Sequence, residues 1–161
     1  MVIWIIGKSG SGKSYLAQKI FNKVKLKKKT IWIDGDNFRK KYCKDLGYSI
    51  KDRRINSKRI QNFCLKHEKQ NKIVICSILS IFPNHQKANR KIFKKYFQIY
   101  IKSNLKVLKK RNNKGIYSNI DNVVGKDIKF PKPYKNDLII NNKFNKEILP
   151  YNSFIIKKII K

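Results

Sequence analysis

A chain of 161 residues, 41% of them hydrophobic, is long enough to fold as a single domain, residues 1–161, around a full core. No apolar run approaches the roughly 20 residues that span a membrane, and the chain enters its first apolar run directly. We therefore expect a cytoplasmic protein with no signal peptide. Because the chain contains 40 Lys and Arg residues and only 9 Asp and Glu residues, its formal charge is +31, which suits polyanionic partners.

The first motif along the chain is a glycine-rich loop between a predicted strand, 2–6, and a predicted helix, 13–24. The loop consists of Gly7, Lys8, Ser9, Gly10, Ser11, Gly12, Lys13 and Ser14. Glycines in this frame let successive backbone N–H groups point at phosphate oxygens, and the helix adds its positive amino end. Lys13 would reach the β- and γ-phosphates, and the Ser14 hydroxyl would ligate Mg²⁺. The motif predicts a site for ATP and Mg²⁺.

Further along the chain, apolar runs alternate with segments of helical periodicity. We expect strands at 30–33, 73–78, 97–101 and 138–140, and helices at 37–45, 50–70, 85–96 and 105–110, with a weak helix or strand in the tail. Pro83 is expected to break the chain before the third of these helices. Residues 112–134 show little periodicity, and a loop of this length predicts a short lid, at about 112–131, over the nucleotide. The alternation predicts an α/β three-layer sandwich of the P-loop NTPase type, with a five-stranded parallel sheet.

Residues 7–14, 34–36 and 77–80 each follow a predicted strand. The carboxyl ends of parallel strands share one edge, where ligands bind. We expect strand 30–33 to neighbour strand 2–6, which would bring Asp36 close to the phosphate loop. A carboxylate there can take a proton from an acceptor hydroxyl or orient it for in-line attack, although a turn-capping Asp is the alternative. Asp34, two residues earlier, would point to the opposite side of an extended segment, so that one of the two faces the site and the other anchors the turn or the metal shell.

Four of the six arginines lie between residues 39 and 59, in a chain whose basic residues are mostly lysine. They are Arg39, Arg53, Arg54 and Arg59. A guanidinium can hold phosphate or sulfate with two bonds, so the cluster predicts an anion grip, with ordinary solvated helix faces as the alternative. Tyr48 lies on a predicted loop between Gly47 and Ser49 and can offer its ring to a base, although an exposed tyrosine without a role is the alternative.

Together these residues resemble adenylylsulfate kinase, the family that transfers the γ-phosphate of ATP to the ribose 3′-hydroxyl of adenosine 5′-phosphosulfate. The resemblance covers about residues 1–141. Its motifs are G-K-S-G-S-G-K-S at 7–14, D-G-D-N-x-R at 34–39, D-L-G-Y-S-x-x-D-R-x-x-N-x-x-R at 45–59, S-I-L-S at 77–80 and K-G-I-Y at 114–117. The resemblance implies a kinase that uses ATP and Mg²⁺ on a small-molecule nucleotide acceptor, and it is compatible with a homodimer.

Residue by residue, the resemblance implies that Asp36 assists the acceptor hydroxyl and that Tyr48 stacks on the acceptor base. The residues that it places around the acceptor nucleotide are Asp34, Arg39, Arg53, Asn56, Ser77, Ile78 and Leu79. Ser80 falls where the family carries a phosphoserine and is a candidate catalytic residue, although direct in-line transfer needs no such intermediate. Lys114 and Gly115 belong to the lid that closes over both nucleotides.

The chain departs from the family pattern on the acceptor side. Residues 123–127 read V-V-G-K-D where the family has F-T-G-I-D, so Val123 replaces the second aromatic residue that stacks on adenine. Because stacking is worth about 1–3 kcal/mol per base, losing one ring suits a smaller base. Residues 123–133 and residues 48–53 are similar to the cytidine diphosphoramidate kinase subgroup, which phosphorylates a 3′-hydroxyl in bacterial capsule modification. Adenosine 5′-phosphosulfate and cytidine diphosphoramidate therefore remain near-equal alternatives for the acceptor.

A basic P-loop protein that binds RNA or DNA is the alternative from another class, and it would explain the charge of +31 directly. The lysines, however, are scattered over every segment, without interleaved aromatic residues or a recognition motif. This distribution favours compositional drift over a nucleic-acid interface.

Overall fold

The computed structural model describes residues 1–111, 115, 122–144 and 149–160. Within these residues, five parallel strands form one sheet in the order β2-β3-β1-β4-β5. The strands are β1 (Val2–Gly7), β2 (Thr30–Asp34), β3 (Ile73–Ile78), β4 (Tyr96–Lys102) and β5 (Leu138–Asn141). The predicted α/β architecture with a five-stranded parallel sheet is confirmed.

The position of β2 corrects one expectation about the sheet. β2 lies at the edge and pairs only with β3, whereas β1 pairs with β3 and β4. Every residue of β3 is buried, while β2 is buried only at Ile33. A strand that is apolar on both faces suits the inside of a parallel sheet, which explains why β3, and not β2, lies next to β1.

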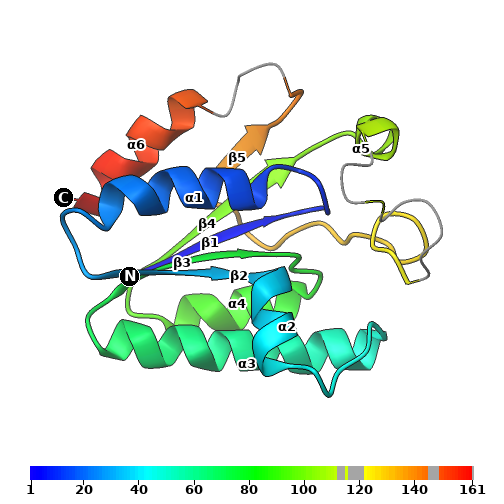
Figure 1. The fold of residues 1–161 in the computed structure, drawn as a ribbon, viewed down its shortest axis with the longest axis horizontal. Helices are drawn as coiled ribbons and strands as arrows, with labels where there is room; N and C mark the ends of the chain where they lie inside the picture. The colour runs from blue at the N-terminus through cyan, green and yellow to red at the C-terminus, as the bar shows by residue number, and fades with distance from the viewer. Residues whose placement is uncertain (112–114, 116–121, 145–148, 161) are drawn as a thin grey trace.

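Helices cover both faces of the sheet and make three layers (Figure 1). On one face, α1 (Lys13–Val24) and α6 (Leu149–Ile160) pack over Ile3 and Ile5 of β1. On the other face, α2 (Gly35–Tyr42), α3 (Ile50–Lys69) and α4 (Pro83–Ile92) lie over Trp4 and Ile6. Because successive strand residues point to opposite faces, one short apolar run in β1 anchors both helical layers.

Helix ends agree with the predicted ones to within a few residues, and two of them are informative. Ser49 caps α3, because its hydroxyl accepts a bond of 3.1 Å from the Asp52 N–H. Pro83 was expected to break the chain, but it is the first residue of α4, where its missing N–H costs nothing. The short α5 spans Leu105–Arg111, and the weakly patterned tail forms α6.

The connections from β1 diverge, which places a crevice at the carboxyl edge of the sheet. The chain leaves β1 toward β2 and β3 on one side and later returns to β4 on the other. This reversal of strand order is where doubly wound sheets bind ligands. The phosphate loop follows β1 directly and therefore lies at the reversal. Among the described residues, no helix combines the length and apolar character that crossing a lipid bilayer requires.

The opposite end of the molecule depends on a buried carboxylate, which generates a stability prediction. Glu68 of α3 accepts bonds from the backbone N–H groups of Lys94 (3.1 Å) and Lys95 (3.3 Å), just before β4. We expect Glu68→Ala to lower the free energy of unfolding by about 1–3 kcal/mol, since two partly buried donors lose their acceptor. Urea unfolding measures this, with Lys69→Ala on the same helix as an exposed control. Equal losses in both variants would contradict the assignment.

Candidate active site at the carboxyl edge of the sheet

The loop between β1 and α1 has the backbone of an anion cradle. Gly10 and Gly12 adopt positive φ angles of 75° and 96°, which glycine tolerates best. A side chain at Gly7 would come within 2.6 Å of the Ile101 carbonyl oxygen. The loop closes on itself, because the Lys8 carbonyl accepts bonds from the Ser11 N–H (3.2 Å) and from the Lys13 ammonium (2.7 Å). The predicted phosphate loop thus has the required curl in front of the amino end of α1.

The Asp34 carboxylate connects the phosphate loop to two neighbouring strands. Its Oδ2 accepts bonds from the hydroxyls of Ser14 (2.6 Å) and Ser77 (3.2 Å), and the indole N–H of Trp32 donates to the Ser77 hydroxyl (3.0 Å). Its Oδ1 accepts the N–H groups of Asp36 and Asn37 and so caps α2. The carboxylate therefore holds the hydroxyl of Ser14 in a fixed position.

This geometry corrects the expectation that Asp34 and Asp36 point to opposite sides of an extended segment. The helix α2 already begins at Gly35, so Asp36 lies in its first turn and Asp34 is its N-cap. A helix at this place turns the Asp36 side chain toward the crevice, while Asp34 remains at the strand end beside Ser14. Of the two carboxylates, Asp34 makes the anchoring contacts, to Ser14 and to the first turn of α2.

One cavity gathers most of the predicted site residues. Its lining includes twelve of them: Ser9, Lys13, Ser14, Asp34, Asp36, Arg39, Tyr48, Arg53, Asn56, Ser77, Ile78 and Leu79. It also includes Gly35, Ser57 and Ile60, which the sequence reasoning missed. Arg53, Asn56, Ser57 and Ile60 follow the spacing i, i+3, i+4, i+7 on α3, so helical periodicity counted from Arg53 would have found the last two. The cavity thus joins the phosphate loop to α2, α3 and the end of β3.

Outside the phosphate loop and the arginine cluster, three predicted residues remain: two lie elsewhere in the structure, and one lies outside the described residues. Ser80 is buried, 3% exposed, and its hydroxyl accepts a bond of 3.2 Å from the Gln86 amide instead of lining the cavity. Its catalytic assignment has no support from this position and stays a prediction. Gly115 is described, but among the described residues no neighbouring atom lies within 4 Å of the place where its side chain would start. Lys114 and most of residues 112–121 lie outside the described residues.

Two of the four clustered arginines face the cavity with Tyr48. The guanidinium of Arg39 lies 4.8 Å and that of Arg53 5.4 Å from the centre of the Tyr48 ring. Arg53 donates to the carbonyls of Tyr48 (3.0 Å) and Asn122 (2.8 Å), and Arg39 donates to the Gly47 carbonyl. Burial, together with the positive charge of Arg39, lowers the pKa of Arg53. Two cations held side by side by neutral carbonyls form a site suited to an anion.

The other two arginines serve different purposes, so the four do not form one anion grip. Arg59 makes a two-pronged ion pair with Asp45, at 2.7 and 2.8 Å. The guanidinium of Arg54 lies over the Phe82 ring at 4.6 Å. Neither residue lines the cavity, because α3 turns them away from the face that carries Arg53 and Asn56.

A second cavity lies on the other side of the phosphate loop and was not predicted. It is lined by Lys102, Ser103, Asn104, Val107, Asn141, Asn142, Lys143 and Tyr151. The buried Asn142 side chain donates to the Ser11 carbonyl at 3.0 Å and so ties the end of β5 to the loop. The sequence signal that could have predicted this cavity is the polar residues that directly follow β4 and β5, since both strands end at the ligand-binding edge.

Comparison with known proteins agrees with this geometry. The family model described as adenylylsulphate kinase matches residues 1–141. A cytidine diphosphoramidate kinase of Campylobacter jejuni is 38% identical over 167 residues, which cover 98% of this chain and 95% of that protein. A probable adenylyl-sulfate kinase of Bacillus subtilis is 33% identical over 149 residues, covering 88% and 75%.

A solved structure shares the fold. The APS kinase of Mycobacterium tuberculosis, in complex with AMPPNP and APS, superposes with a TM-score of 0.88 at 24% identity and covers 99% of this chain and 97% of that one. The phosphate loop, the parallel sheet and the match over 141 residues lead to one conclusion. The chain belongs to the adenylylsulfate kinase family, P-loop kinases that transfer a phosphoryl group from ATP to a hydroxyl group.

Proposed function

We propose that this protein is an Mg²⁺- and ATP-dependent kinase of the ribose 3′-hydroxyl of a nucleotide that carries a small anionic or phosphoramidate group at its 5′ end. One observation carries the proposal: a single cavity contains Lys13 and Ser14 of the phosphate loop together with Asp36 and the arginine pair. Donor and acceptor groups therefore face the same space, as direct phosphoryl transfer requires.

On the donor side, the N–H groups of the loop and the Lys13 ammonium would hold the β- and γ-phosphates. The Ser14 hydroxyl and the Asp34 carboxylate lie 2.6 Å apart, and both are the oxygen ligands that Mg²⁺ prefers. This donor set fits an ion held by one or two protein oxygens and by phosphate. When bound, Mg²⁺ would neutralise charge on the β- and γ-phosphates.

On the acceptor side, Asp36 would accept the proton of the 3′-hydroxyl, or orient it, as the new bond from O3′ to the γ-phosphorus forms. The bond between the γ-phosphorus and the bridging oxygen breaks, and ADP leaves. Arg39 and Arg53 would hold the anionic 5′ group, and the Tyr48 ring, which is 58% exposed, is available to a base. The Asn56 amide lines the same wall and can bond to the sugar or phosphate.

Of the two candidate acceptors we favour cytidine diphosphoramidate. The relative of that name matches 98% of the chain, and the match thus extends beyond the 141 residues of the family model. Val123, which stands where the family pattern has an aromatic residue, is buried and presents no second ring to a base. Adenosine 5′-phosphosulfate remains the second candidate, because relatives named adenylyl-sulfate kinase also match most of the chain.

The cellular context is part of the proposal. We propose a cytoplasmic enzyme whose partner is a small nucleotide, with a homodimer as the candidate assembly. RNA or DNA binding is the competing explanation of the +31 charge. Tight binding to random oligonucleotides with a steep salt dependence, together with absent kinase activity, would favour it.

The acceptor prediction compares two nucleotides in one assay. We expect ADP release with cytidine diphosphoramidate at a kcat/KM at least about tenfold above that with adenosine 5′-phosphosulfate, a ratio equal to about 1.4 kcal/mol. Phosphorus NMR of the product is expected to show a 3′-phosphate, and a 3′-deoxy acceptor is the matched control. The reverse order would assign the acceptor to adenosine 5′-phosphosulfate, and no turnover with either would overturn the proposed kinase.

The catalytic carboxylate is tested by Asp36→Asn. We expect turnover to fall by about 10²–10⁴-fold, the usual contribution of a positioned general base, while ATP affinity stays within about twofold. Steady-state kinetics and ATP titration measure the two effects. Asp45→Asn is the matched control, because Asp45 pairs with Arg59 outside the cavity. Near-normal turnover in Asp36→Asn would remove Asp36 from this role.

The metal assignment is tested by Ser14→Ala, which removes the hydroxyl beside Asp34. We expect the Mg²⁺ concentration for half-maximal turnover to rise by about tenfold or more, since a hard cation loses one oxygen ligand. A titration of activity with Mg²⁺ at saturating ATP measures this shift. Binding of ATP without Mg²⁺ serves as the control and is expected to be unchanged. An unchanged Mg²⁺ requirement would place the metal elsewhere.

A further inference from the structure

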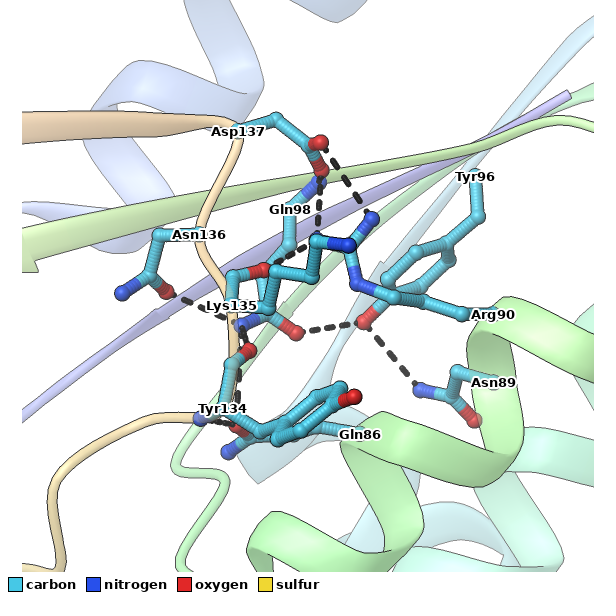
Figure 2. A network of polar contacts seen from close by, with 9 residues as sticks. All are labelled: Gln86, Asn89, Arg90, Tyr96, Gln98, Tyr134, Lys135, Asn136 and Asp137. Carbon is cyan, nitrogen blue, oxygen red and sulfur yellow. Dashed lines mark hydrogen bonds and ion pairs between the residues drawn. The ribbon is translucent and has the colours of Figure 1, made fainter.

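A buried glutamine on α4 bonds to two separate segments of the chain. Gln86 is 1% exposed. Its amide N–H group lies 3.2 Å from the Ser80 hydroxyl and 3.3 Å from the Ser80 carbonyl oxygen, and donates to both. Its amide oxygen accepts the Tyr134 backbone N–H at 2.7 Å (Figure 2) and the Gln98 side-chain amide at 3.5 Å. A side chain with a donor and an acceptor at one end can join two backbones, and Gln86 uses both.

The first of these segments is a wall of the acceptor cavity. Ser77, Ile78 and Leu79 line the cavity, and Ser80 follows them directly. The bonds from Gln86 to Ser80 therefore hold the end of this wall against α4. Without Gln86, the Ser80 carbonyl oxygen would lose this donor and would need another hydrogen-bond partner.

The second segment, residues 122–137, contacts Arg53, which lines the same cavity. At its beginning, the Asn122 carbonyl accepts the bond from Arg53 at 2.8 Å. At its end, Gln98 of β4, fully buried, donates to the Tyr134 carbonyl (2.8 Å) and to the Asn136 side chain (2.9 Å). Arg90 and Asp137 add an ion pair of 2.8 Å (Figure 2).

An apolar cluster joins the two segments between these polar attachments. Ile81 and Phe82, just after the wall, pack with Val124 of the second segment. Leu79, Ile128 and Phe130 pack around them. The wall and the segment therefore pack together as one unit beside the arginine pair. Gln86 bonds to both of them.

We propose that Gln86 is a positioning residue for the acceptor: it fixes the wall at 77–80 and the segment at 122–137 so that Arg53 and the wall keep their relative positions. This rests on the proposed function, because it concerns the acceptor half of that site. The donor half has its own attachment, the Asn142 bond to the phosphate loop, which does not involve α4. Loss of Gln86 therefore affects the acceptor and spares ATP.

The kinetic test compares two buried glutamines with the same substitution. In Gln86→Met, which keeps the volume and removes the bonds, we expect the acceptor KM to rise by about tenfold or more and the ATP dissociation constant to stay within about twofold. Gln61→Met is the matched control, since Gln61 is also buried but bonds to Asn89 and Lys58. Its expected effect is on the melting temperature, with a near-normal acceptor KM. Equal changes in both variants, or an unchanged KM in Gln86→Met, would overturn the proposal.

A second measurement does not need turnover and so separates this proposal from the proposed function. Hydrogen exchange in the free protein is expected to quicken at 78–82 and 132–136 in Gln86→Met and not in Gln61→Met. In Gln86→Glu, the carboxylate can accept from Tyr134 but cannot donate to Ser80, so only 78–82 is expected to quicken. This variant also decides the matter if Gln86→Met does not fold. If the wild type lacks activity with both acceptors, the proposed function fails and exchange alone tests Gln86, unchanged protection being the result that overturns it.

Discussion

The carboxylate of Asp34 is the contact on which the site depends. Its two oxygens hold the Ser14 hydroxyl from the phosphate loop, the Ser77 hydroxyl from β3 and the first N–H groups of α2. Hydrogen bonds to a charged group are worth about 1.5–3 kcal/mol each, so one side chain fixes three elements together. Because α2 begins at this point, the same contact also decides where Asp36 lies relative to the phosphate loop.

The cavity carries basic side chains both at the phosphate loop and at α2 and α3, which suits anionic reactants. Lys13, Arg39 and Arg53 line it together with Asp34 and Asp36. Two of the arginines outside it, Arg59 and Arg90, are paired with carboxylates. Arg39 and Arg53 bond instead to the backbone carbonyls of Gly47, Tyr48 and Asn122. Together with the overall charge of +31, this arrangement attracts nucleotides and steers them toward the crevice.

Donor and acceptor halves of the site are supported by different parts of the fold. The phosphate loop is attached to β1, α1 and, through Asn142, to the end of β5. The proposed acceptor half rests on α2, α3 and the end of β3, and the buried glutamines of α4 and β4 hold the segment whose Asn122 carbonyl accepts a bond from Arg53. A division of this kind would let the proposed acceptor side change while the phosphate loop keeps its geometry.

The phosphate loop and the α/β class could be predicted from the sequence, because both depend on local spacing. Gly7 to Ser14 specify their own backbone shape, and alternating apolar runs specify strands and helices. The edge position of β2, the ion pair that removes Arg59 from the cavity, the burial of Ser80 and the double attachment of Gln86 could not be predicted. Each depends on which distant residue lies opposite, and a single sequence carries no periodic signal for such pairs. Local conformation was therefore determined by the sequence, whereas the tertiary structure decided which polar side chains face the cavity and which are engaged elsewhere.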